Sequence, residues 1–114
     1  MKVFISQPMN GRSEEEVMEE REKYVEAFRE WIYKHVATDE ITRKACTFNV
    51  IDNYNKPYAP ADASRLWYLA DSLKLMADAE YVVFVPGWKK SYGCRVEMMC
   101  CTFYNIPYIK MKKC

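Results

Sequence analysis

The chain has 114 residues, of which 50% are hydrophobic and 15% aromatic, which is enough apolar material for one core and too little for two. Seventeen basic residues against sixteen acidic ones leave a net charge of +1. This balance excludes the strongly basic surface that duplex nucleic acid or an anionic membrane attracts. We therefore expect a single domain over residues 1–114.

The cysteines are odd in number and show no Cys-x-x-Cys spacing, and the single histidine, His35, does not complete a metal site with them; they are Cys46, Cys94, Cys100, Cys101 and Cys114. We expect reduced thiols, no metal and no cofactor. The N-terminal residues pass straight into a strand pattern, and no run approaches the ~20 apolar residues that cross a bilayer. The sequence thus predicts a cytoplasmic protein that partners neither a membrane nor a nucleic acid polymer.

The first predicted elements are a short strand and a long helix. Residues 3–6 form an apolar run typical of a buried strand, and a loop over 7–12 follows, with turn signals at Pro8 and at Asn10-Gly11. Ser13 and Glu16 form a capping box, which predicts a helix from there to about residue 34. Apolar residues then recur at helical spacing on one face, which we interpret as core: Val17, Tyr24, Val25, Phe28, Trp31 and Ile32.

The middle of the chain, residues 35–63, has the weakest pattern. Residues 47–51 predict a second strand, whereas Asn53, Pro57 and Pro60 indicate a loop. A second helix follows, capped by Asp62 or Ser64. Its predicted apolar face consists of Leu66, Leu69, Ala70, Leu73, Met76 and Ala77.

The C-terminal part predicts a strand over 81–85, a helix over about 93–104 and a last strand over 107–110. The last helix has apolar residues on more than one face, which predicts burial on two sides, one of them against a partner subunit. Strands and helices alternate along the chain. This order predicts an α/β fold, a flavodoxin/Rossmann-like three-layer sandwich with a mainly parallel sheet of four or five strands.

The unit over residues 81–97, a strand, a polar loop and a helix, has the layout of an active site. Ligands of open α/β sheets bind outside the carboxyl ends of the strands, so Ser91, Gly93 and Glu97 are expected to stand together there. The alternative is a surface turn followed by a core helix with a solvated glutamate. These residues alone leave both interpretations open.

Three features occur together in this chain: the stretch Phe4-Ile-Ser-Gln-Pro-Met-Asn-Gly11, the aspartate Asp71, and the segment Phe84-Val-Pro-Gly-Trp-x-x-Ser-x-Gly-x-x-x-Glu97. Together they resemble the nucleoside 2-deoxyribosyltransferase-like superfamily over most of the chain. The similarity is closest to its small bacterial and phage members and to the nucleoside 5'-monophosphate N-hydrolases. The resemblance implies that Glu97 is the nucleophile at the anomeric carbon, and that Asp71, 26 positions before it, handles the sugar and the base.

Cleavage of an N-glycosidic bond uses carboxyl groups in two roles. A carboxylate beneath C1' stabilises oxocarbenium character or forms a covalent glycosyl-enzyme intermediate, the role implied for Glu97. A second carboxyl, kept partly neutral by burial or by a negative neighbour, would protonate the departing base. Asp71 is the candidate for this acid, although without the resemblance a helix-surface aspartate is the plainer interpretation.

Position 91 bears on the substrate. Many transferases of the superfamily carry an aspartate six residues before the nucleophile, whereas the nucleotide N-hydrolases resemble this chain in having a serine, which can donate to a phosphate. Ser91 and the backbone N–H groups around Gly93, at a helix N-terminus, are therefore predicted to hold a 5'-phosphate. The opposite wall would comprise Ser6, Asn10, Gly11 and Arg12.

Trp88 follows the third predicted strand and offers an aromatic face on which a base can stack. It would equally serve to cap the core or to fill a dimer contact. The residues leave these roles open.

The chain departs from the transferases at two points. Phe4 stands where they place the tyrosine that orients the nucleophile, and the chain ends soon after its last strand, where they borrow an asparagine from a neighbouring subunit. Cleavage of a (deoxy)nucleoside 5'-monophosphate is therefore the favoured expectation. Base exchange and non-catalytic binding of a nucleotide derivative are the alternatives. The expected partners are a small nucleotide or nucleoside and further copies of the chain, in a homodimer or a dimer of dimers.

Overall fold

The computed structural model describes residues 1–113 and has an α/β fold with one sheet of four parallel strands. The strands are β1 (Lys2–Ser6), β2 (Asn49–Val50), β3 (Tyr81–Phe84) and β4 (Tyr108–Lys110), in the order β2-β1-β3-β4. β1 pairs with β3 from Val3 opposite Tyr81 to Ser6 opposite Phe84. The predicted α/β class is confirmed, with four strands of the four or five expected.

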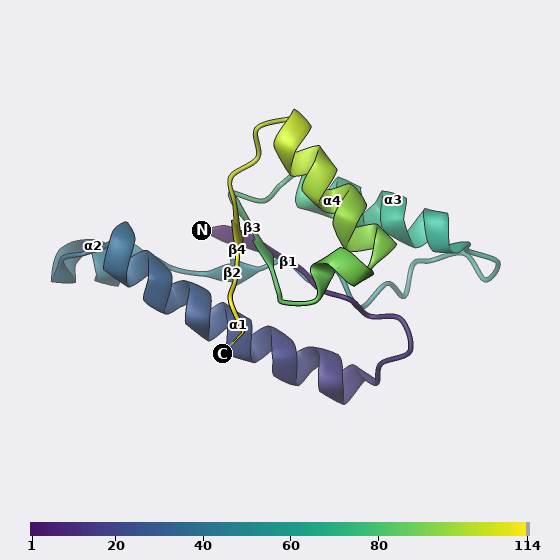
Figure 1. The fold of residues 1–114 in the computed structure, drawn as a ribbon, viewed down its shortest axis with the longest axis horizontal. Helices are drawn as coiled ribbons and strands as arrows, with labels where there is room; N and C mark the ends of the chain where they lie inside the picture. Colours follow the sequence, from purple (N-terminus) through teal and green to yellow (C-terminus); the bar gives the residue numbers. More distant parts are fainter. Residues whose placement is uncertain (114) are drawn as a thin grey trace.

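Helices lie on both faces of the sheet. α1 (Glu14–His35) covers one face, and α3 (Arg65–Met76) and α4 (Tyr92–Phe103) cover the other (Figure 1). The short α2 (Glu40–Ala45) lies beyond the end of α1, away from the sheet, and a 3-10 turn, η1 (Trp88–Lys90), precedes α4. The sheet is thus the middle of three layers.

The side chains of β1 and β3 alternate between the two faces, so the molecule has a core on each side of the sheet. The core on the α1 side contains Val3, Ile5, Tyr24, Phe28, Ile32, Ala37, Val83 and Val85. The core on the α3–α4 side contains Phe4, Met76, Val82, Phe84 and Cys101. Neither central strand has a solvent face, which explains why both are almost continuously apolar.

A serine hydroxyl caps the N-terminus of each of the three long helices. Ser13 Oγ accepts from the Glu16 N–H at 3.1 Å, Ser64 Oγ from the Trp67 N–H at 3.1 Å, and Ser91 Oγ from the Cys94 N–H at 3.3 Å. Each bond satisfies one of the backbone donors that a helix start leaves without a partner. The predicted cap at Ser13 is confirmed, and of the two candidates for α3 the cap is Ser64.

The middle of the chain differs from the expectation in two ways. The strand predicted over 47–51 shrinks to Asn49–Val50, and α2 was not predicted at all. No residue of α2 is buried, so no apolar stripe marks it in the sequence. On α3, only Met76 of the predicted apolar face is buried, and Leu66 is 71% exposed.

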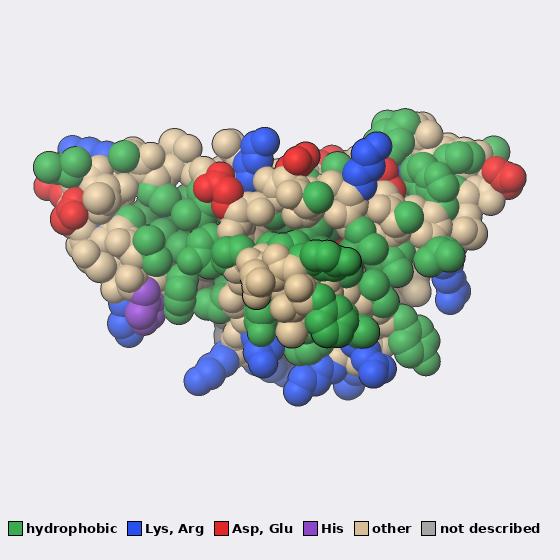
Figure 2. All heavy atoms as spheres, turned by 90° about the horizontal axis from the view of Figure 1, so that it is seen from above, with side chains coloured by type: hydrophobic (Ala, Val, Ile, Leu, Met, Phe, Trp, Pro, Cys, Tyr) green, Lys and Arg blue, Asp and Glu red, His purple; other side chains and the backbone are tan. Residues whose placement is uncertain are grey.

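Within this chain the last helix buries one side, and the side expected to face a partner subunit is exposed. α4 buries Cys94, Glu97 and Cys101, whereas Met99 and Phe103 are exposed. The side of the molecule that carries α3 and α4 shows many hydrophobic side chains at its surface (Figure 2). Apolar spacing identified the residues that share a face, but no side chain of residues 1–113 covers the second face of α4.

Over residues 1–113, no helix combines the length and the hydropathy needed to cross a bilayer. Cys46, Cys94, Cys100 and Cys101 are free thiols, and Cys114 lies outside the described residues.

Candidate functional site

The order of the strands creates a crevice next to β1. β1 and β3 are neighbours, yet the chain continues from β1 to β2 on one side and from β3 to β4 on the other. Such a reversal is the point where open α/β sheets bind ligands, outside the carboxyl ends of the strands. The loops after β1 and β3 both begin at this edge, so residues from both can face one ligand.

A cavity of about 730 Å³ lies at this position. This volume falls in the range of about 300–1,000 Å³ that is typical of small-molecule sites. Its walls come from the loop after β1, from residues 53–56, from α3 and from the first turns of α4. The predicted site residues Asn10, Ser91, Gly93 and Glu97 all line it. The structure therefore brings together the two loops that the sequence placed at one site.

Glu97 is a buried carboxyl in the wall of this cavity. It lies on the second turn of α4 and is only 6% exposed. The hydroxyl of Ser6, the last residue of β1, donates to Glu97 Oε1 at 2.8 Å. Among residues 1–113, no side chain or N–H group hydrogen-bonds Glu97 Oε2. Ser6 thus fixes one oxygen and leaves the other for a ligand.

The environment of Glu97 favours its protonated form. Burial raises the pKa of Glu97 to about 7, and the Ser6 hydrogen bond and the charge of Lys56 oppose this rise only in part. Near neutral pH the carboxyl therefore exists in both protonation states. Side chains tuned in this way within clefts are typical of acid, base or nucleophile roles.

Lys56 is a buried cation in the same cavity, and sequence reasoning missed it. Its side chain is 4% exposed. Its Nζ donates to Ser72 Oγ at 2.8 Å and to the Tyr68 carbonyl at 3.0 Å, and forms an ion pair with Asp71 Oδ2 at 3.1 Å. These three acceptors match the three protons of the ammonium group. Lys56 lies in a loop without periodicity, so no pattern in the sequence marked it.

Asp71 faces Lys56 rather than the cavity, whose lining does not include it. Tyr58 OH donates to Asp71 Oδ2, the oxygen that also pairs with Lys56. The hydrogen bond from Tyr58 and the contact with Lys56 lower the pKa of Asp71. This direction is opposite to the raised pKa that we expected of an acid for the departing base.

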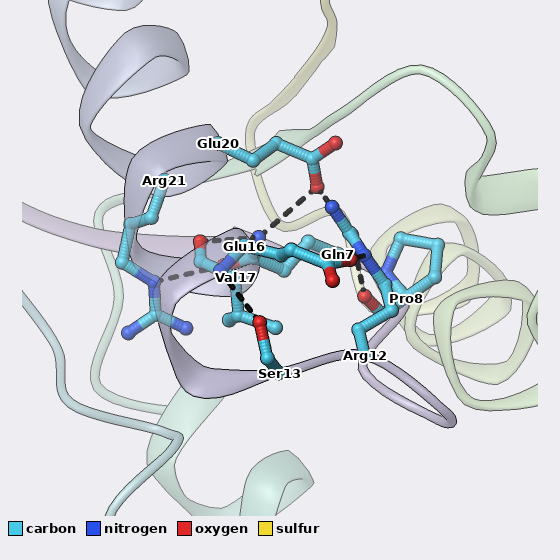
Figure 3. Close-up of polar contacts among 8 residues, drawn as sticks. All are labelled: Gln7, Pro8, Arg12, Ser13, Glu16, Val17, Glu20 and Arg21. Atoms are coloured by element: carbon cyan, nitrogen blue, oxygen red, sulfur yellow. Dashed lines mark hydrogen bonds and ion pairs between the residues drawn. The ribbon is translucent and has the colours of Figure 1, made fainter.

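Arg21 is a second functional-site residue that sequence reasoning missed. It is 7% exposed, and its Nε donates to Gln7 Oε1 at 2.9 Å, while its Nη2 donates to Asn53 Oδ1 (Figure 3 shows the contact with Gln7). Asn53 Nδ2 in turn donates to the Ile5 carbonyl at 3.1 Å. Gln7 and Asn53 both line the cavity, so Arg21 ties two of its walls together.

A signal for Arg21 was present in the sequence. The residue lies between Val17 and Tyr24 at helical spacing, on the buried stripe of α1. A charge in an apolar stripe needs buried partners, and burial indeed lowers the pKa of Arg21.

The remaining predicted residues lie outside the cavity that Glu97 lines. Arg12 points away from it and donates to Glu20 Oε1 at 2.8 Å and to the Pro8 carbonyl at 2.9 Å (Figure 3). Gly11 adopts a φ of 72°, a conformation that favours glycine, and makes the turn that precedes α1. Trp88 packs on Phe84, with 5.5 Å between ring centroids, as the core-capping alternative predicted.

Within residues 1–113, no three His, Cys, Asp or Glu side chains are grouped closely enough to hold a metal ion. No protein-family model matches the chain, and no curated protein or solved structure matches it either.

Proposed function

We propose that the protein cleaves the N-glycosidic bond of a (deoxy)nucleoside 5'-monophosphate and releases the free base, with Glu97 as the nucleophile. One observation carries the proposal. Glu97 is buried in the wall of a ligand-sized cavity, Ser6 holds its Oε1, and its Oε2 makes no hydrogen bond with residues 1–113. The spacing of Ser91, Gly93 and Glu97, which resembles that of nucleotide N-hydrolases, supports the same assignment.

The reaction needs Glu97 in its ionised form. Glu97 Oε2 bonds to C1' as the bond from C1' to the base nitrogen breaks, and the electron pair leaves with the base, which takes a proton from water. A second water then attacks C1', the ester bond to Glu97 breaks, and the proton of this water passes to the hydroxide left by the first. One water is consumed overall, the sugar gains a hydroxyl group and the carboxylate is restored.

The rim of the cavity supports a phosphorylated substrate. Ser91 and Gly93 lie at the N-terminus of α4, where a helix presents N–H groups and the positive end of its dipole. Arg65 and Lys90 line the same cavity, and neither forms an ion pair with a carboxylate of residues 1–113. The rim therefore favours an anionic group such as a 5'-phosphate.

A second candidate function is nucleotide binding without catalysis. Asp71, the expected acid, is held by Lys56 and Tyr58, so no second carboxyl faces Glu97 across the cavity within residues 1–113. A site without an acid expels a base less readily, because the unprotonated base is a poorer leaving group.

One experiment separates the two functions. Purified protein is incubated with each ribo- and deoxyribonucleoside 5'-monophosphate, and free base is measured by chromatography. We expect release from at least one substrate, its loss in Glu97→Gln, and no change in Glu30→Gln, which alters an exposed glutamate on α1. Saturable binding of a monophosphate without base release would favour the second function. Full turnover in Glu97→Gln would remove Glu97 from the mechanism.

A further inference from the structure

We propose that Lys56 favours the ionised form of Glu97, and that Asp71 and Tyr58 are positioning residues that hold Lys56 in place and do not touch the substrate. The catalytic meaning of this inference rests on the proposed function. The arrangement itself is visible in the free protein and can be tested there.

The ammonium group of Lys56 is held in a fixed position. A lysine side chain normally moves freely in water, but this one is 4% exposed and has an acceptor for each of its protons. Its acceptors come from α3, whereas Lys56 itself belongs to the loop before that helix. The ammonium group is therefore a stationary charge with no proton left for a ligand.

Lys56 differs from the other groups around Glu97 in being both charged and buried. Ser6 on β1 is neutral, and Cys94 and Cys101 on α4 are thiols whose pKa values burial raises. Arg65 and Lys90 also line the cavity, but both are exposed, so solvent and salt screen their charges. Lys56 is the one buried cation among the described residues that line this cavity, and a buried charge acts at a lower effective dielectric constant.

Asp71 links Lys56 and Tyr58 to α3. Its Oδ2 accepts from Tyr58 and pairs with Lys56, so the carboxylate bridges the loop to α3. Replacing Asp71 by asparagine has two opposite consequences for Glu97. Loss of a negative charge favours ionised Glu97 and lowers its pKa, whereas release of Lys56 raises it. The sign of the change therefore distinguishes a positioning residue from a nearby charge.

The experiment follows the titration of Glu97 in the free protein. Glutamate side chains are labelled with ¹³C at the carboxyl carbon, the Glu97 resonance is assigned with Glu97→Gln, and its midpoint is measured between about pH 4 and pH 9. We expect Lys56→Met to raise the midpoint by about one pH unit. Asp71→Asn should raise it by less, and Lys56→Arg, which keeps the charge, should stay near the wild-type value.

Lys74→Met is the matched control, because it removes a lysine from the same helix as Asp71 at an exposed position outside the cavity. Its midpoint should equal that of the wild type. An unchanged or lower midpoint in Lys56→Met would overturn the role of Lys56, and a lower midpoint in Asp71→Asn would overturn the positioning role of Asp71.

Circular dichroism checks that each variant folds, and Lys56→Gln, whose amide can still donate to Asp71, takes the place of Lys56→Met if that variant does not fold. The titration needs no substrate. Absence of base release would therefore refute the proposed function without moving these midpoints, and an unchanged midpoint would refute this inference even in an active enzyme.

Discussion

Ser6 and Glu97 lie 91 positions apart in the sequence, and a hydrogen bond of 2.8 Å joins the Ser6 hydroxyl to one oxygen of the Glu97 carboxyl. The bond runs from the end of β1 to α4, so the sheet fixes the position of a side chain on a helix. The sequence did not identify the residue that orients Glu97. Phe4 has no hydroxyl and is fully buried in the core, and the residue that orients Glu97 is Ser6.

Ser6→Ala should lower base release by roughly 10- to 100-fold, because an unanchored carboxyl spends less time in the attacking geometry. For the wild type, activity should rise with pH through about 7, as Glu97 ionises. This midpoint should move to higher pH in Ser6→Ala, since the lost bond stabilised the charged form. The measurement is the pH profile of kcat/KM. Ser13→Ala, which removes a hydroxyl at the start of α1, should keep the wild-type profile. Identical profiles for Ser6→Ala and the wild type would contradict the role of Ser6.

Glu97→Gln should stabilise the protein at high pH. An unfolded glutamate titrates near 4.3, whereas burial raises the pKa of Glu97 to about 7 in the folded protein. Between these values the folded state binds the extra proton, so the free energy of unfolding of the wild type falls as pH rises, by about 4 kcal/mol in total. Glu97→Gln has no titrating group at this position, so its free energy of unfolding does not fall in this way. It should be more stable than the wild type at pH 8, and the gap should close toward pH 4.

Urea unfolding of both proteins at several pH values measures this gap. Glu30→Gln serves as the control, because Glu30 is exposed on α1 and should show no gap that depends on pH. A constant difference between Glu97→Gln and the wild type at all pH values would contradict the expectation.

Ser91→Ala should weaken binding of nucleoside monophosphates more than binding of the matching nucleosides, because the hydroxyl is assigned to the phosphate. The same change removes the cap of α4, which costs about 1 kcal/mol of stability in typical helices. Ser64→Ala is matched to it, since it removes an equivalent cap from α3. Isothermal titration calorimetry on both variants separates the two effects. Equal losses for nucleotide and nucleoside in Ser91→Ala would reject the phosphate assignment.

Arg21→Met should destabilise the fold by about 3 kcal/mol, because Gln7 Oε1 and Asn53 Oδ1 would lose their charged donor inside the protein. For a domain of this size the expected fall in Tm is roughly 10–15 °C. Arg95→Met, at an exposed position on α4, should leave Tm nearly unchanged. Thermal unfolding followed by circular dichroism makes the comparison. Equal Tm values for the two variants would show that the buried guanidinium is not a structural link.

The chain should form a homodimer through the exposed face of α4. Met99 and Phe103 are 53% and 69% exposed there, and a two-fold dimer needs only one such patch. Phe103→Arg should give a monomer, and base release should fall, because the first turns of the same helix line the cavity. Ile41→Arg, on the equally exposed α2, should stay dimeric. Light scattering at micromolar concentration decides the point, and a monomeric wild type would contradict it.

Local patterns in the sequence were enough to place β1, β3 and β4, the caps of α1 and α3, and the helix that carries Glu97. Ser13 and Ser64 mark the starts of their helices because a cap is a contact over three residues. The run at 81–85 is apolar because both faces of β3 are buried. Glu97 could be singled out only because the Ser-x-Gly-x-x-x-Glu segment resembles that of a known superfamily.

The features that the sequence did not predict depend on contacts between distant segments. Lys56 is buried only because α3 supplies its acceptors, and Asp71 has a lowered pKa because a loop residue, Tyr58, reaches it. Leu66 shares a helical face with core residues, yet it lines the cavity and is 71% exposed, and periodicity carries no information about what covers a face.

The pairing of β1 with β3 also determines when the site can form during folding. Val3 pairs with Tyr81 and Ser6 with Phe84, so the two strands that carry the crevice meet only after the chain closes a loop of most of its length. Contacts of such long range form late and slow the folding of a domain. A chain still emerging from the ribosome contains β1 and α1 long before Glu97 has been made. The cavity therefore cannot form until residues from both ends of the chain have been made and have come together.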